Sequence, residues 1–130
     1  MGESERKTVL VVDDDPGIRF PLVLKLRGAG FDVCEATDGE EALQSVKERP
    51  VDLAIVDVGM PRMDGYTLCE RFRAEPTTAA LPVIILTAQD LGVPADVAAR
   101  IGEHRFLTKP FSPRQLVKEV EELLRGGGGD

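Results

Sequence analysis

The stretch LAIVDVGMPRMDG, residues 53–65, decides how this chain folds. Its first four residues are an unbroken apolar run, which is typical of a strand that is covered on both faces. Asp57 ends the run, and a carboxylate that is buried without a partner is costly. We therefore expect other segments of the chain to bring partners for Asp57 to the end of this strand.

Polar side chains follow three other apolar runs in the same way. Asp13 and Asp14 come after the run at 8–12, Thr87 after the run at 83–86, and Lys109 after the run at 105–108. In open parallel sheets, binding sites lie outside the carboxyl ends of the strands. We therefore expect acid, hydroxyl and ammonium groups to meet beside Asp57.

The order of the elements predicts an α/β fold. Expected strands at 8–12, 31–36, 53–57, 83–86 and 105–108 alternate with expected helices, which begin near residues 15, 37, 64, 94 and 112. Such alternation implies right-handed crossovers and a doubly wound, five-stranded parallel sheet with helices on both faces. Pro21 lies inside the first expected helix and should kink it or delay its start.

The composition indicates one soluble domain. The chain has 130 residues and a net charge of -7, which argues against a surface that binds nucleic acid directly. We expect an N-terminal tail at 1–6, a folded domain at 7–125, and a glycine-rich tail or linker start at 126–130. No membrane span or signal peptide is recognisable, and Cys34 and Cys69 have neither metal nor disulfide spacing. We therefore expect a cytoplasmic protein with reduced thiols and no membrane contact.

The acidic residues predict a metal site. Asp13 and Asp14 would repel Asp57 in a dry cleft, and a divalent cation would resolve that conflict. Ligands that are all oxygen atoms suit Mg²⁺ or Mn²⁺ rather than zinc. The alternative is that residues 13–15 only favour a helix N-terminus, which we accept for Asp15.

Asp57 is the candidate nucleophile, because carboxylates form aspartyl-phosphates. Lys109 would add positive charge for an incoming phosphoryl group, and the Thr87 hydroxyl would donate to a phosphate oxygen. A simple ion pair between Lys109 and Asp57 is the alternative, and a working site without phosphate would contain the same pair. Considered alone, Thr87 is better explained as a threonine at a strand end whose hydroxyl makes a local hydrogen bond to the backbone.

Taken together, the motifs resemble the receiver domain of bacterial two-component response regulators, whose familiar single-domain member is the chemotaxis regulator. The matching stretches are VVDDD (11–15), IVD (55–57), MPRMDG (60–65), LTA (86–88) and KPF (109–111). The resemblance covers residues 8 to about 125. It implies a flavodoxin-like sheet with strand order 2-1-3-4-5.

The resemblance also implies roles for the candidate residues. Asp57 would accept a phosphoryl group from a sensor histidine kinase or a phosphotransfer protein. Asp14 and Asp57 would ligate Mg²⁺ directly, together with the backbone carbonyl of Gly59, and Asp13 would hold the metal through water. Lys109 would pair with the phosphate. The Lys109-Pro110 peptide bond could be cis, which the sequence does not decide.

A conformational switch is implied as well. Thr87 would move toward the phosphate and Phe106 would turn inward behind it, which shifts the face formed by the fourth helix, fifth strand and fifth helix. A downstream effector protein or output domain would recognise that face. We also predict that Gly59 and Gln89 tune the rate of self-dephosphorylation.

Two alternatives belong to other functional classes. A phosphatase of the haloacid-dehalogenase type also uses Asp, Thr, Lys and Mg²⁺, but it carries an Asp-x-Asp nucleophile after the first strand. Here residues 13–15 lack the threonine that should follow, and no cap domain is present. The other alternative is a receiver scaffold that binds partners without phosphorylation. The intact set of five site residues argues against it.

Overall fold

The computed structural model of the chain describes residues 6–87 and 105–127. Its sheet consists of the parallel strands β1 (Thr8–Val12), β2 (Asp32–Ala36), β3 (Leu53–Asp57), β4 (Val83–Thr87) and β5 (Arg105–Thr108). The strand order is β2-β1-β3-β4-β5, so the prediction of a doubly wound sheet in the order 2-1-3-4-5 is confirmed. The expected fourth helix and Gln89 lie outside the described residues.

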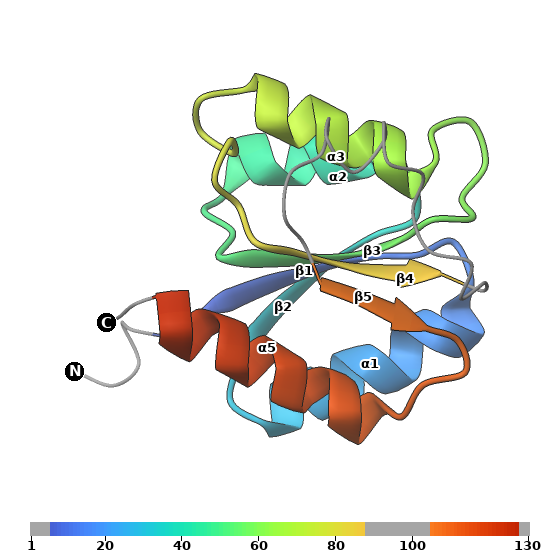
Figure 1. Ribbon diagram of the computed structural model, residues 1–130, viewed down its shortest axis with the longest axis vertical. Helices are drawn as coiled ribbons and strands as arrows, with labels where there is room; N and C mark the ends of the chain where they lie inside the picture. Colours follow the sequence, from blue (N-terminus) through green and yellow to red (C-terminus); the bar gives the residue numbers. More distant parts are fainter. Residues whose placement is uncertain (1–5, 88–104, 128–130) are drawn as a thin grey trace.

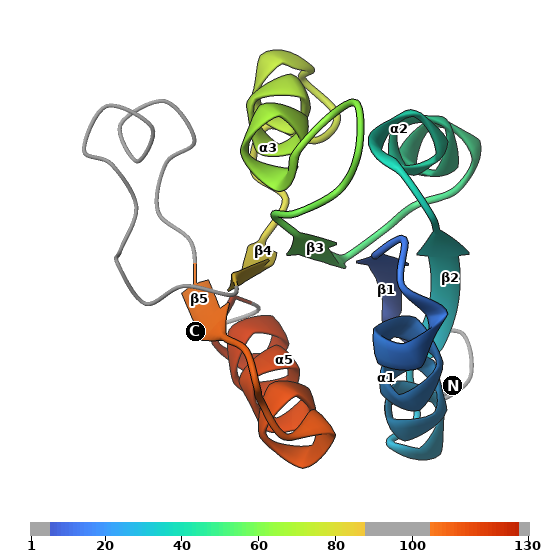
Figure 2. The same cartoon turned by 90° about the vertical axis from the view of Figure 1, so that its right-hand side faces the viewer.

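Helices cover both faces of the sheet, as predicted (Figures 1 and 2). α1 (Pro16–Gly28) and α5 (Pro113–Gly127) lie on one face, and α2 (Gly39–Glu48) and α3 (Gly65–Ala74) lie on the other. Alternate residues of a strand point to opposite faces. Val9 and Val11 accordingly pack with α1 and α5, whereas Leu10 and Val12 pack with α2 and α3. β1, β3 and β4 are buried on both faces for most of their length, which explains why these strands read as unbroken apolar runs.

The helices start where side chains cap their free N–H groups. Asp15 accepts from the Gly17 N–H at 2.9 Å, and Asp64 accepts from the Thr67 N–H at 2.9 Å. α2 has the same arrangement at Asp38. Such caps satisfy N–H groups that have no partner within the helix. These three helices therefore begin just after the carboxyl ends of β1, β2 and β3, at the edge where the site was expected.

Some expected boundaries differ from the structure. The expected start of α1 near residue 15 is confirmed, since the helix begins at Pro16; of the two effects predicted for Pro21, a kink or a delayed start, the delay does not occur. The Asp15 cap and a proline at the first helical position set the start, because a proline there loses no hydrogen bond. β2 begins at Asp32 instead of residue 31, and β4 extends through Thr87. α5 continues to Gly127, two residues into the expected glycine tail.

Gly65 allows α3 to pack directly on the end of β3. A Cβ atom at this position would lie 2.7 Å from the carbonyl oxygen of Asp57 and 2.9 Å from the Cα atom of Val58. The Gly65 N–H also donates to the Val58 carbonyl at 3.1 Å. These two nearest atoms belong to the backbone at the end of β3 and just after it, so they cannot move aside as the tip of a flexible side chain would. The glycine of the MPRMDG motif is therefore required by close packing.

We expect Gly65→Ala to lower the free energy of unfolding by about 2 kcal/mol, because overpacking against backbone forces the strand end or the helix to shift. Urea unfolding monitored by circular dichroism measures this change. Gly28→Ala is the matched control, since a Cβ atom there would meet nothing within 4 Å. That variant should be as stable as the wild type or more so. Equal losses in both variants would contradict the packing explanation.

Candidate functional site

Asp57 and Lys109 form the centre of the site. Asp57 is the last residue of β3 and is only 5% exposed. Its Oδ1 atom accepts a hydrogen bond from Lys109 Nζ at 2.7 Å. The backbone N–H of Lys109 donates to the Thr87 carbonyl at 2.7 Å, which joins the ends of β4 and β5. The Lys109-Pro110 peptide bond is cis.

Asp13 and Asp14 lie next to this pair. Carboxylate oxygen atoms of Asp13, Asp14 and Asp57 all lie within 4.8 Å of one another. Asp13 is fully buried, whereas Asp14 is exposed to solvent. The fold therefore brings together four of the predicted site residues from three strand ends, with one exposed carboxylate on the solvent side.

The surroundings of Asp13 fit a divalent cation. Its Oδ1 atom accepts from the Asp15 N–H at 3.0 Å, but its Oδ2 atom is buried and has no hydrogen-bond partner among the described residues. Buried polar atoms normally have a partner, so an atom without one marks a place where a ligand or water is expected. A ligand set of carboxylate oxygen atoms suits Mg²⁺ or Mn²⁺. The residues present thus fit the metal that the sequence predicted.

Burial of Asp13 raises its pKa from 3.8 to about 6. Loss of water is the largest cause, because it disfavours the charged form. The hydrogen bond from the Asp15 N–H opposes the increase in pKa, as does the charge of Lys109, whereas Asp57 and Asp14 add to it. The site therefore holds more negative charge than Lys109 alone compensates.

Thr87 and Phe106 lie on neighbouring strands. Thr87 ends β4 and is half-buried, so it lies at the same edge of the sheet as Asp57. Phe106 is in β5, paired in register with Ile85, and the residue is 38% exposed. Thr87 is therefore placed near the acid cluster, while Phe106 is partly open to solvent. The roles of both residues as a switch stay predictions.

The loop after Asp57 is held at several points. The Val58 N–H donates to the Leu86 carbonyl at 2.9 Å, and Arg62 forms an ion pair with Asp38 at 2.9 Å. Arg62 has a φ of 67°, a backbone conformation that is uncommon for residues other than glycine. A Cβ atom on Gly59 would lie 3.8 Å from Asp57 Oδ2, so a side chain at that position would border the acceptor. Gly59 thus leaves the space beside Asp57 open.

Sequence reasoning missed Arg19, which lies on α1. Its Nη1 atom donates to the backbone carbonyl of Asp13 at 2.7 Å. An arginine in the second turn of a helix is common, and no spacing in the sequence distinguishes this one from Arg27 on the same helix. The contact depends on how α1 meets the turn after β1, which no local pattern in the sequence indicates.

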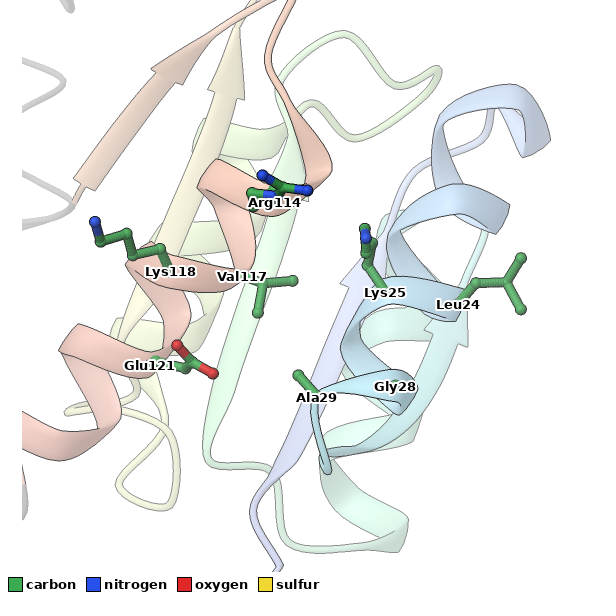
Figure 3. A pocket seen from close by; sticks show the side chains of 8 residues that line it. All are labelled: Leu24, Lys25, Gly28, Ala29, Arg114, Val117, Lys118 and Glu121. Atoms are coloured by element: carbon green, nitrogen blue, oxygen red, sulfur yellow. The ribbon is translucent and has the colours of Figure 1, made fainter.

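Two hollows on the molecule are distinct from the acid cluster. A cavity of about 590 Å³ lies between α1 and α5, away from the carboxyl ends of the strands, and Figure 3 shows the side chains that line it. A second cavity, of about 420 Å³, is bordered by Lys109 and by residues of α1, among them Ile18 and Leu22. Of these two cavities, the second borders one of the predicted site residues, Lys109. The acid cluster itself lies at the open edge of the sheet.

Fold and site together define a class: doubly wound α/β domains with an acid cluster and a lysine at the carboxyl ends of a parallel sheet. Within that class, the chain belongs to the response regulator receiver domain family, whose model matches residues 9–121. The resemblance seen in the sequence is thereby confirmed. Proteins of this family act in two-component signal transduction.

One relative is the DNA-binding response regulator MtrA of Mycolicibacterium smegmatis. It is 37% identical over 123 residues, which is 95% of this chain and 53% of that protein. The chain thus spans about half the length of this relative. No helix in the described ranges is long and apolar enough to cross a membrane.

Two solved structures are similar throughout. The chemotaxis response regulator CheY4 of Vibrio cholerae has a TM-score of 0.84 and 31% identity, with 91% of this chain and 98% of that chain covered. The receiver domain of sensor histidine kinase PA1611 from Pseudomonas aeruginosa has a TM-score of 0.82 and 26% identity, with 93% and 99% covered. That structure has a magnesium ion coordinated in its active site cleft.

The raised pKa of Asp13 predicts how metal-free protein responds to pH. The folded-state pKa of about 6 lies above the ordinary 3.8, so the folded protein favours the neutral form of Asp13. The stability that this preference contributes is fully present below about pH 3.8 and is lost as pH rises through 6, because Asp13 then ionises in its buried position. In EDTA at pH 7.5, we expect Asp13→Asn to be more stable than the wild type by up to about 3 kcal/mol. Near pH 4.5 the difference should shrink.

Urea unfolding at the two pH values measures this difference. Asp32→Asn is the control, because that side chain is exposed and lies at the other end of the sheet. A stability difference between Asp13→Asn and the wild type that does not change with pH would contradict the predicted titration.

Proposed function

We propose that this chain is a phosphorylation-dependent switch of a two-component system, in which Asp57 accepts the phosphoryl group. The observation that supports this most directly is the position of Asp57. It is buried at a strand end, 2.7 Å from Lys109 Nζ, and shares a cluster with Asp13 and Asp14 whose ligand atoms lie within 4.8 Å. A nucleophilic carboxylate, a cation and metal-binding acids are the parts that phosphoryl transfer to an aspartate needs.

The donor is proposed to be a phosphohistidine on a sensor histidine kinase or on a phosphotransfer protein. A carboxylate oxygen of Asp57 attacks phosphorus and forms a P–O bond, while the P–N bond breaks and its electron pair returns to the imidazole. Lys109 stabilises the charge on the phosphoryl oxygens, because its ammonium already lies beside the acceptor. The product is an acyl phosphate on Asp57.

Mg²⁺ is the proposed cofactor, and Mn²⁺ would suit the same ligands. Asp14, Asp57 and the Gly59 carbonyl would hold the ion directly, and Asp13 would hold it through water. When bound, it would neutralise negative charge on the acceptor and on the phosphoryl group. The buried Oδ2 atom of Asp13 supports this assignment, as does the magnesium ion in the PA1611 receiver domain.

The output is proposed to depend on Thr87 and Phe106. A phosphoryl group favours the arrangement in which the Thr87 hydroxyl donates to a phosphate oxygen, and Phe106 then turns inward. In the structure Phe106 is 38% exposed, so it is in the outward state from which the proposed turn would start. The altered surface would include β5 and α5, and an effector protein or an output domain would bind there.

Intact-mass spectrometry after incubation with acetyl phosphate and Mg²⁺ tests the acceptor. We expect a gain of one phosphoryl group in the wild type and none in Asp57→Asn, because the amide is not a nucleophile. EDTA should also abolish the gain. Asp52→Asn is the control for a general loss of negative charge, since Asp52 precedes β3 and lies outside the acid cluster. Its phosphorylation should equal that of the wild type.

Folded wild-type protein that binds Mg²⁺ but gains no mass from acetyl phosphate, and none from a histidine kinase either, would support a phosphorylation-independent scaffold instead. Sustained release of phosphate from small phosphate esters would favour the phosphatase alternative. The proposed switch predicts neither result.

Gly59→Asn is expected to change the rate at which phosphorylated Asp57 decays. A side chain at position 59 would start 3.8 Å from Asp57 Oδ2, close enough to contact the phosphoryl group or the attacking water. Phosphate release after removal of acetyl phosphate measures the rate, with Gly28→Ala as a remote glycine control. Gln89→Ala tests the other predicted position. Identical decay in the wild type and both test variants would contradict the predicted tuning.

A further inference from the structure

The backbone of Asp13 is held on both sides. Its N–H donates to the carbonyl of Ala36 on β2 at 3.1 Å, and its own carbonyl accepts from Arg19 Nη1 at 2.7 Å. Its Oδ1 atom accepts from the Asp15 N–H at 3.0 Å. Among the polar atoms of Asp13, Oδ2 therefore stays available within the acid cluster.

Besides the Asp13 carbonyl, Arg19 binds a side chain on the neighbouring strand β2. Its Nε atom donates to Glu35 Oε1 on β2 at 2.9 Å, and its side chain is only 11% exposed. The guanidinium group also lies over the ring of Phe20, 5.2 Å from the centroid. A planar guanidinium is suited to bind two acceptors at once in fixed directions. Arg19 thus ties the turn after β1 to the neighbouring strand.

We propose that Arg19 is a positioning residue for the acid cluster, a role that rests on the proposed function. The carbonyl that it binds belongs to the peptide unit between Asp13 and Asp14. Because that unit is planar, fixing its carbonyl sets the direction in which both residues leave the turn. Arg19 thereby holds two carboxylates where a cation can bind them together with Asp57, and Glu35 holds Arg19 in place.

A purely electrostatic role would have the opposite effect. Arg19 is a positive charge near the site, so it repels a divalent cation, and its removal would tighten cation binding on that basis alone. Loss of a positioning contact weakens binding, because ligands that are not held in place must be ordered by the metal. The direction of the change in Mg²⁺ affinity therefore distinguishes the two roles.

The experiment is a Mg²⁺ titration of wild type, Arg19→Met and Arg27→Met, followed by calorimetry or by the backbone amide signals of residues 13–15. Arg27 is the matched control, since it is also on α1, carries the same charge and donates to a β2 carbonyl, that of Val33, at 3.4 Å. We expect Arg19→Met to raise the Kd for Mg²⁺ on the order of tenfold, as is usual when a residue that orients metal ligands is lost. Arg27→Met should bind like the wild type.

Mg²⁺ binding by folded Arg19→Met that is equal to or tighter than that of the wild type would overturn the proposal. If Arg19→Met does not fold, Arg19→Lys serves instead. This variant keeps the charge but loses the planar fork, so its affinity should be lower than that of the wild type, and an unchanged affinity would also overturn the proposal. Wild-type protein that binds no Mg²⁺ would overturn the proposed function itself, and the role of Arg19 with it.

Discussion

The rest of the site depends on a concentration of negative charge at one edge of the sheet. Asp13 and Asp57 are buried there, Asp14 lies beside them, and Lys109 supplies one compensating charge at 2.7 Å from Asp57. Burial without full compensation raises the pKa of Asp13 to about 6. Any added positive charge would stabilise a site of this kind. The site depends on the fold, which keeps the carboxylates together.

The fold keeps them together through its topology. Asp13 follows β1, Asp57 ends β3 and Lys109 follows β5, while β4 lies between β3 and β5 in the sheet. Backbone hydrogen bonds between the strand ends, such as that from the Lys109 N–H to the Thr87 carbonyl, fix the register of the strand ends. The close approach of α3 at Gly65 then limits how the end of β3 can move. Distant parts of the sequence thus define one rigid edge.

Much of this arrangement could be predicted from the sequence, because apolar runs and the polar residues that end them are local signals. The strands, their order and the meeting of Asp13, Asp14, Asp57 and Lys109 followed from those signals and the family resemblance. Element ends were less predictable, since caps and packing decide them: β2 began one residue later than expected, and α5 ran into the expected tail. Arg19 was missed because its contact depends on how α1 meets the turn after β1.

The ion pair between Asp57 and Lys109 does not by itself separate a working receiver from a scaffold, because both would contain it. Asp13 separates them better. A scaffold gains nothing from a buried carboxylate oxygen that has no hydrogen-bond partner, and replacing such a group by a neutral one usually stabilises a fold. Here the turn is instead held in place by the Ala36 carbonyl and by Arg19, while Oδ2 has no hydrogen-bond partner within residues 6–87 and 105–127. The fold thus loses stability at Asp13 Oδ2 while it fixes the backbone of the turn around it. This combination is expected where a site is preorganised to bind a cation.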